Sequence, residues 1–177
     1  MIITTRHIKK ENIKRKELTY ATKWMANLLM GSRLPPKLDI HFEFKDMEHL
    51  GLCSVDDCES YPRAFLIEIK KGMDRKEILG SVAHELVHVK QFARRELVSF
   101  CPHKNPKYQG KEFKESLCYW DQPWEIEAFG REIGLVTRYE EHLQDNPRLK
   151  NSFLRGKMAT DGWDTEYGRY VLDIGSL

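Results

Sequence analysis

Residues 74–89 constrain the fold of this 177-residue chain more than any other segment, because they carry the signals of a long apolar helix. Asp74 and Glu77 have the spacing of a helix N-cap residue and its reciprocal partner. The apolar residues that follow recur at helical spacing: Ile78, Leu79, Val82, Ala83, Leu86, Val87 and Val89. We therefore predict a capped helix whose apolar side chains are available for burial.

The same helix carries the motif HELVH, formed by His84, Glu85 and His88 with two apolar residues between. Positions i and i+4 lie on one helical face, so the two imidazoles can be directed at a single tetrahedral ion. Glu85 is displaced around the helix, yet near enough to take a proton from water activated by a metal. Composition alone gives such a match about 2% of the time, so we interpret the motif as a zinc site rather than two surface histidines.

A catalytic zinc ion usually has three protein ligands and one open position, so a further ligand is expected downstream. We predict that this ligand is Glu125, near the start of a helix that runs from Pro123 to about Gln144. Glu127 lies about 200° around that helix from Glu125 and is expected to point elsewhere. Glu127 and His103 remain the alternatives.

Two strands are predicted ahead of the motif helix. Apolar and polar residues alternate over residues 38–45, which indicates a half-buried strand with His41 facing away from the core. Residues 64–69 form a short β-prone run that predicts the second strand, and the polar residues 51–62 predict turns between the two. An amphipathic helix is predicted over residues 13–30.

Residues 98–121 lack helical periodicity and predict a loop that borders the site, with a hairpin or irregular strand at 108–113. These elements indicate an α+β fold, in which a short antiparallel or mixed sheet packs on the motif helix and a second helix carries the third ligand. The length fits one domain, which we assign to residues 1–145. Residues 146–177 form a C-terminal extension for which the sequence predicts no structure.

Charge argues against a dedicated nucleic-acid binder, because 29 Lys and Arg oppose 27 Asp and Glu to give a net charge of +2. Basic residues nevertheless gather near the N-terminus: Arg6, Lys9, Lys10, Lys14, Arg15 and Lys16. We interpret them as the solvated face of a helix, with contacts to phosphates as the alternative.

The N-terminus lacks the apolar core of a signal peptide, and no window approaches the 18 apolar residues that a membrane span needs. We therefore expect a cytoplasmic protein with no membrane partner. Cys53, Cys58, Cys101 and Cys118 are then expected to be reduced thiols, and a structural zinc ion bound by all four is the alternative.

The motif HELVH, followed downstream by the helical Glu-x-x-Ala of Glu125 to Ala128, resembles the gluzincin metallopeptidases. The order of helix, strands and motif helix, with a Gly-x-x-Phe element at Gly110 to Phe113, also resembles SprT-like metallopeptidase domains. SprT-like proteins take a third histidine from the segment after the motif helix. This chain has Gln109 before Gly110 where they have His-Gly, which favours Glu125. Many small phage and bacterial proteins share a motif like the run at residues 123–128.

These resemblances imply a small zincin-like domain that binds Zn²⁺, with a cleft bordered by a strand that binds extended peptide. We expect a zinc peptidase that hydrolyses peptide bonds in a protein substrate, with Glu85 as general base. The substrate is expected to add a strand beside residues 64–69. Tyr108, Tyr119 and His103 are candidates to stabilise the developing oxyanion.

Two alternative functions remain open at this stage. The SprT-like resemblance implies cleavage of proteins attached to DNA, with the basic N-terminal residues contacting phosphates. The other alternative is a binding or assembly module that zinc stabilises and that cuts no substrate. The expected compartment is the cytoplasm in each case, and the host cytoplasm if a phage encodes the chain.

Overall fold

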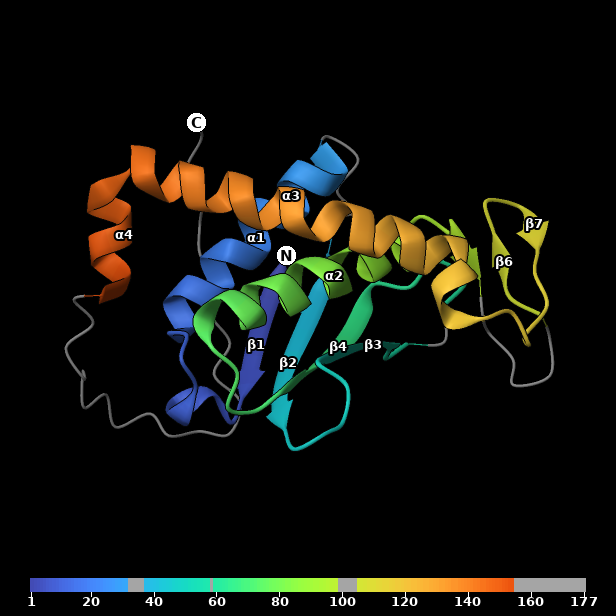
Figure 1. Cartoon of the computed structure of the whole chain (residues 1–177), viewed down its shortest axis with the longest axis horizontal. Coiled ribbons are helices and arrows are strands. Elements are labelled where there is room, and N and C mark those ends of the chain that lie inside the picture. Colours follow the sequence, from blue (N-terminus) through green and yellow to red (C-terminus); the bar gives the residue numbers. More distant parts are fainter. Residues whose placement is uncertain (32–36, 58, 99–104, 155–177) are drawn as a thin grey trace.

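The computed structural model describes residues 1–31, 37–57, 59–98 and 105–154 (Figure 1). Its elements in chain order are β1 (Ile2–Arg6), η1 (Ile8–Lys10), α1 (Arg15–Met30), β2 (Asp39–Lys45), β3 (Gly51–Val55), β4 (Ala64–Lys70), α2 (Arg75–Ala93), β5 (Leu97–Val98), β6 (Lys107–Tyr108), β7 (Lys111–Glu112), η3 (Tyr119–Asp121), α3 (Pro123–Asp145) and α4 (Pro147–Leu154). A mixed sheet, a small antiparallel sheet and these helices confirm the predicted α+β class.

The main sheet has the strand order β1-β2-β4-β3, with β1, β2 and β4 parallel and β3 antiparallel to β4. One face is apolar, because alternate side chains meet there in rows such as Ile3, Ile40 and Phe65. His41 lies on the opposite face, as the alternation predicts. Both strands predicted from the sequence, β2 and β4, are therefore confirmed.

Strand β1 shows that the basic N-terminal residues do not form one helical face, so that interpretation is wrong. Arg6 ends β1, Lys9 and Lys10 lie in η1, and only Arg15 and Lys16 belong to α1. The four residues before Arg6 are β-branched and favour a strand. Local preference alone does not make them one, and it is pairing with β2 that does. This pairing is not visible in the local sequence.

Strand β3 also differs from the sequence-based expectation, which places only turns at residues 51–62. Residues Gly51–Val55 pair with β4 and form an edge of the sheet beside α2. The strand begins with glycine and has no fully buried side chain, so its composition resembles a turn. Pairing with β4 decides its structure.

Helix α2 lies between the sheet and the other helices, and it contacts α1, α3, β3 and β4. The predicted capping box is present: the Asp74 side chain accepts from the Glu77 N–H at 2.8 Å, and the Glu77 side chain accepts from the Asp74 N–H at 2.8 Å. Arg75 donates to Glu17 of α1 at 2.8 Å and to Glu140 of α3 at 2.6 Å. These contacts fix the start of the motif helix against both neighbouring helices.

Helix α3 lies across α2 in Figure 1, and it begins at Pro123 and ends before Asn146, as the sequence predicts. Strands β6 and β7 form the hairpin expected within residues 108–113, with Gln109 and Gly110 at positive φ in its two-residue turn.

The C-terminal extension contributes helix α4, which the sequence does not predict. Phe153 of α4 is buried and its ring lies 5.7 Å from that of Tyr20 in α1. No helix in the part of the chain that the structure describes combines the length and apolarity needed to cross a membrane.

Candidate metal centre

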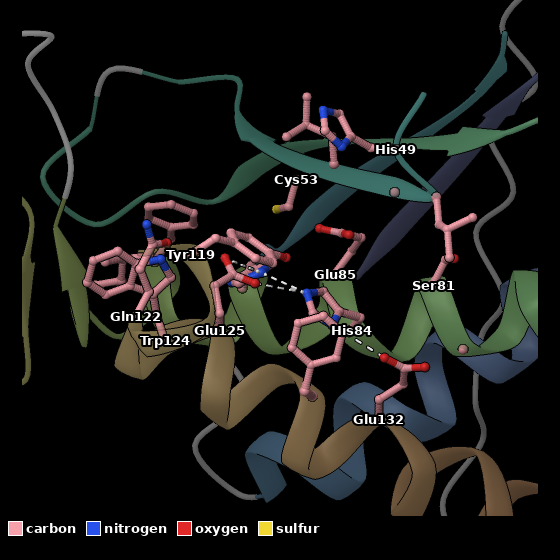
Figure 2. A pocket seen from close by; sticks show the side chains of 18 of the residues that line it. His49, Cys53, Ser81, His84, Glu85, Tyr119, Gln122, Trp124, Glu125 and Glu132 are labelled. Carbon is pink, nitrogen blue, oxygen red and sulfur yellow. Dashed lines mark hydrogen bonds and ion pairs between the residues drawn. The ribbon is translucent and has the colours of Figure 1, made fainter. Parts of the chain in front are cut away.

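Three side chains from two helices converge: His84 and His88 of α2, and Glu125 of α3. Figure 2 shows His84 and Glu125 pointing toward each other. The two histidine Nε2 atoms are 3.2 Å apart. Glu125 Oε2 lies 3.3 Å from His84 Nε2, and Glu125 Oε1 lies 3.4 Å from His88 Nε2. All three side chains are about one-tenth exposed. The structure thus brings together the three residues predicted as metal ligands.

The spacing of these atoms fits a single zinc ion. Zinc bonds of about 2.0–2.1 Å at tetrahedral angles place ligand atoms about 3.3 Å apart, close to the three observed separations. Two imidazole nitrogens and a carboxylate oxygen are also donors that zinc accepts in catalytic sites. The group formed by His84, His88 and Glu125 could therefore hold a metal ion.

Charge at this centre also suits a cation. Burial disfavours the charged imidazole of His84, but contacts with Glu125 and Glu132 prevail and raise its pKa to about 9. Burial acts against the Glu125 carboxylate, yet bonds with His84 and His88 lower its pKa to about 2. The carboxylates thus favour positive charge at the two imidazoles, and a divalent cation can supply that charge.

Glu127 points away from the three converging side chains, as its angular position on the helix predicts. Its carboxylate accepts from Gln91 Nε2 at 3.0 Å and from the Tyr108 hydroxyl at 2.9 Å, and it is paired with Lys90. Burial opposes ionisation, but these bonds lower the pKa of Glu127 to about 2. The other alternative ligand, His103, lies outside the described residues.

A second layer of contacts orients both histidines, and the sequence reasoning missed it. His84 Nδ1 lies 3.4 Å from Glu132 Oε2, and His88 Nδ1 lies 2.9 Å from Gln91 Oε1. Such partners commonly fix the ring orientation of metal-binding histidines. A signal existed for Glu132, because it follows Glu125 by two helical turns and shares its face of α3.

The outer edge of β3 faces the motif helix. Two hydrogen bonds show which residues of this strand pair with β4: Lys70 N to Leu50 O at 3.1 Å, and Asp56 N to Ala64 O at 2.9 Å. Because an antiparallel ladder alternates, the backbone groups of the odd-numbered residues Gly51 and Cys53 point toward the outer edge. In the described part of the chain no strand pairs with that edge.

Glu85 lies against this edge (Figure 2). The backbone N–H of Cys53 donates to its carboxylate, and a Cβ atom at Gly51 would lie 2.6 Å from Glu85 Oε1. The side chain is 5% exposed, and burial raises the pKa of Glu85 to about 7. No local sequence signal links Gly51 or Cys53 to the HELVH motif, because their contacts with Glu85 form only when β3 pairs with β4.

The position of β4 overturns one expectation about the substrate. β4 pairs with β2 on one side and with β3 on the other, so its backbone groups cannot accept another strand. A peptide therefore cannot add beside residues 64–69. The edge that lies next to the candidate metal centre belongs to β3.

A cleft of about 1290 Å³ opens between β3 and the start of α3, and His84, Glu85, His88 and Glu125 line it. Tyr119 also lines the cleft, is 46% exposed, and shares a hydrogen bond with Glu125. Tyr108, in contrast, is buried with its hydroxyl on Glu127. Of the two tyrosines considered for oxyanion stabilisation, only Tyr119 lines the cleft.

The remaining histidines and cysteines have varied surroundings. His41 and His142 bond to Thr4 and Tyr20, and His49 is exposed where it lines the cleft. Cys53 and Cys118 are free thiols, as expected. Cys58 and Cys101 lie outside the described residues, so the alternative of a zinc site built from all four cysteines is not tested.

Comparisons with protein-family models, with curated proteins and with solved structures find no match for this chain.

Proposed function

We propose that this chain is a zinc-dependent peptidase with a zincin-like domain, which hydrolyses peptide bonds in a protein substrate. The observation that carries the proposal is the arrangement at the cleft. Three donors are spaced for one zinc ion, and the carboxylate of Glu85 is buried beside them. A strand edge with outward-facing backbone groups borders the same cleft.

His84, His88 and Glu125 would hold the zinc ion, which when bound polarises a carbonyl group and makes water more acidic. The Glu85 carboxylate accepts the proton from the attacking water and returns it to the leaving amine. Its bond from the Cys53 N–H holds the carboxylate against β3 at the edge of the cleft. Tyr119, whose hydroxyl bonds to Glu125 in the cleft, would turn that O–H from Glu125 to the developing oxyanion.

The substrate lies as an extended segment along the outer edge of β3. Main-chain hydrogen bonds at such an edge give affinity with little dependence on substrate sequence, because every residue supplies the same groups. Gly51 and the Cys53 carbonyl provide outward backbone groups at the level of Glu85, whereas the Cys53 N–H is already bonded to that carboxylate. This edge takes the role that the sequence assigned to residues 64–69.

A non-catalytic zinc module fits the arrangement less well. A structural zinc site is usually closed by four protein ligands, whereas among the residues that the structure describes three donors converge here beside an open cleft. A structural site also has no need of Glu85, whose burial costs free energy. Cleavage of DNA-associated proteins stays a prediction from the SprT-like resemblance.

The test of this function is a cleavage screen of the zinc-loaded chain against a library of unfolded proteins. We expect cleavage that a zinc chelator abolishes and that added zinc restores, because the ion is needed to activate water. Identical cleavage before and after chelation would contradict the proposal. So would the absence of any product from the zinc-loaded chain.

Gly51→Ala should lower kcat by up to about 100-fold, because the new methyl group displaces the Glu85 carboxylate. Gly130→Ala is the matched control, since a Cβ there meets no atom within 4 Å and alanine favours a helix. Steady-state kinetics of the two variants give the comparison. Equal rates for both variants would show that Glu85 does not depend on its contact with Gly51.

A further inference from the structure

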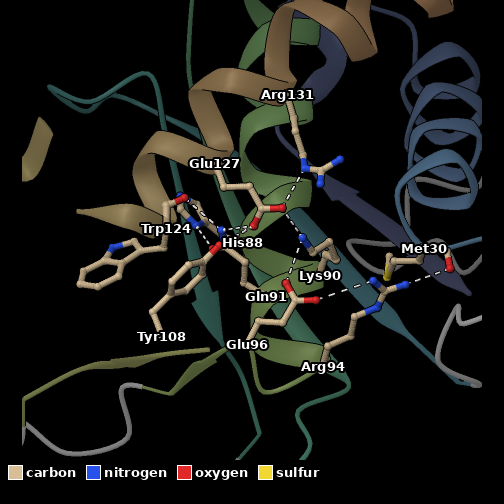
Figure 3. Close-up of polar contacts among 10 residues, drawn as sticks. All are labelled: Met30, His88, Lys90, Gln91, Arg94, Glu96, Tyr108, Trp124, Glu127 and Arg131. Carbon is tan, nitrogen blue, oxygen red and sulfur yellow. Dashed lines mark hydrogen bonds and ion pairs between the residues drawn. The ribbon is translucent and has the colours of Figure 1, made fainter. Parts of the chain in front are cut away.

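Gln91 lies fully buried behind the candidate metal centre, at the junction of α2, α3 and the β6–β7 hairpin (Figure 3). Its Oε1 atom lies 2.9 Å from His88 Nδ1. Its Nε2 atom lies 3.0 Å from the Trp124 carbonyl oxygen and 3.0 Å from Glu127 Oε2. All the polar atoms of this side chain therefore have partners.

The partners fix which way the Gln91 amide faces. The Trp124 carbonyl can only accept hydrogen bonds, and the Glu127 carboxylate, paired with Lys90 and Arg131, also accepts. The amide NH₂ group must face these two acceptors, so the amide oxygen must face His88. A rotated amide would set oxygen against two acceptors, which is strongly unfavourable in a buried site.

We propose that Gln91 is a positioning residue for His88: it accepts a hydrogen bond from Nδ1–H and so directs the Nε2 lone pair at His84 and Glu125. The inference rests on the proposed function, since it concerns the same metal site. Glu127 belongs to the hydrogen-bond network that holds Gln91 against His88. Its bonds from Lys90 and Tyr108 hold it in place, which extends the support of the metal site to the β6–β7 hairpin.

Two substitutions separate positioning from simple packing. Gln91→Met keeps the length of the side chain but has no oxygen for Nδ1–H. Gln91→Glu keeps that oxygen, yet it removes both donated bonds and sets a carboxylate against Glu127. Thermal stability should therefore fall further for Glu than for Met. Zinc affinity should follow the opposite order, because a carboxylate supports a metal-binding histidine as well as an amide oxygen does.

The experiment measures zinc affinity of the full chain by competition with a chelator, beside its melting temperature. We expect Gln91→Met to weaken zinc binding about 10- to 100-fold, while Gln91→Glu stays within a few-fold of wild type. Affinity that falls in the same order as stability would overturn the inference and leave a packing role. If wild type itself binds no zinc, the proposed function falls together with the inference.

A spectroscopic measurement on wild type keeps the inference testable should either variant fail to fold. Long-range ¹H–¹⁵N spectra of the zinc-loaded chain should show His88 with hydrogen on Nδ1 and the metal on Nε2. The opposite arrangement, with hydrogen on Nε2, would overturn the inference even if zinc binds tightly.

Discussion

Glu85→Gln should reduce the rate of peptide cleavage at least about 100-fold, with zinc content and fold unchanged. Glutamine keeps the size of the side chain and one acceptor oxygen, so the bond from the Cys53 N–H can persist. It cannot take up a proton at neutral pH, which removes the general base. The loss should therefore appear in kcat, because proton transfer belongs to the chemical step.

The comparison uses Glu141→Gln as its matched control. Glu141 is exposed on α3 and does not line the cleft, so its replacement should leave the rate at the wild-type level. Near wild-type cleavage by Glu85→Gln would refute the mechanism. Equal partner binding by wild type and Glu85→Gln, with no cleavage by either, would favour the non-catalytic zinc module.

The longer helices α2 and α3 could be predicted from the sequence because their signals are local. The Asp74–Glu77 capping box and the apolar periodicity define α2, and Pro123 marks the start of α3. The same periodicity shows that Glu125 and Glu127 face different ways, since two residues around a helix nearly reverse the direction of a side chain, and the resemblance to gluzincins favours Glu125. These features require no knowledge of the neighbouring elements.

The strands β1 and β3 could not be predicted, because pairing with distant segments creates them. Five residues of mixed polarity become β3 when β4 lies beside them. The contacts of Glu85 with Gly51 and Cys53 depend on that pairing and were therefore missed too. The role of Gln91 needs the hairpin and α3 to be in place.

Loss of a residue that supports a metal ligand without touching the metal weakens zinc binding about 10- to 100-fold. Glu125→Gln should weaken zinc binding by more than this, because Glu125 is a ligand itself. A carboxamide is a poor zinc ligand, although it has nearly the same shape as the carboxylate. Glu127→Gln is the matched change two residues away. It should keep one bound zinc ion and weaken binding no more than the loss of an indirect contact does, because Glu127 reaches the metal site through Gln91. His84→Ala and His88→Ala should lose most of the bound zinc, since each removes one of three ligands.

Zinc content and affinity of the purified wild type, Glu125→Gln and Glu127→Gln chains test the central claim most directly. We predict one tightly bound zinc ion per wild-type chain, near wild-type stoichiometry in Glu127→Gln, and a severe loss of affinity in Glu125→Gln. Wild type that binds no zinc would contradict the metal centre altogether. Stronger loss in Glu127→Gln than in Glu125→Gln would show that the wrong carboxylate has been assigned to the ion.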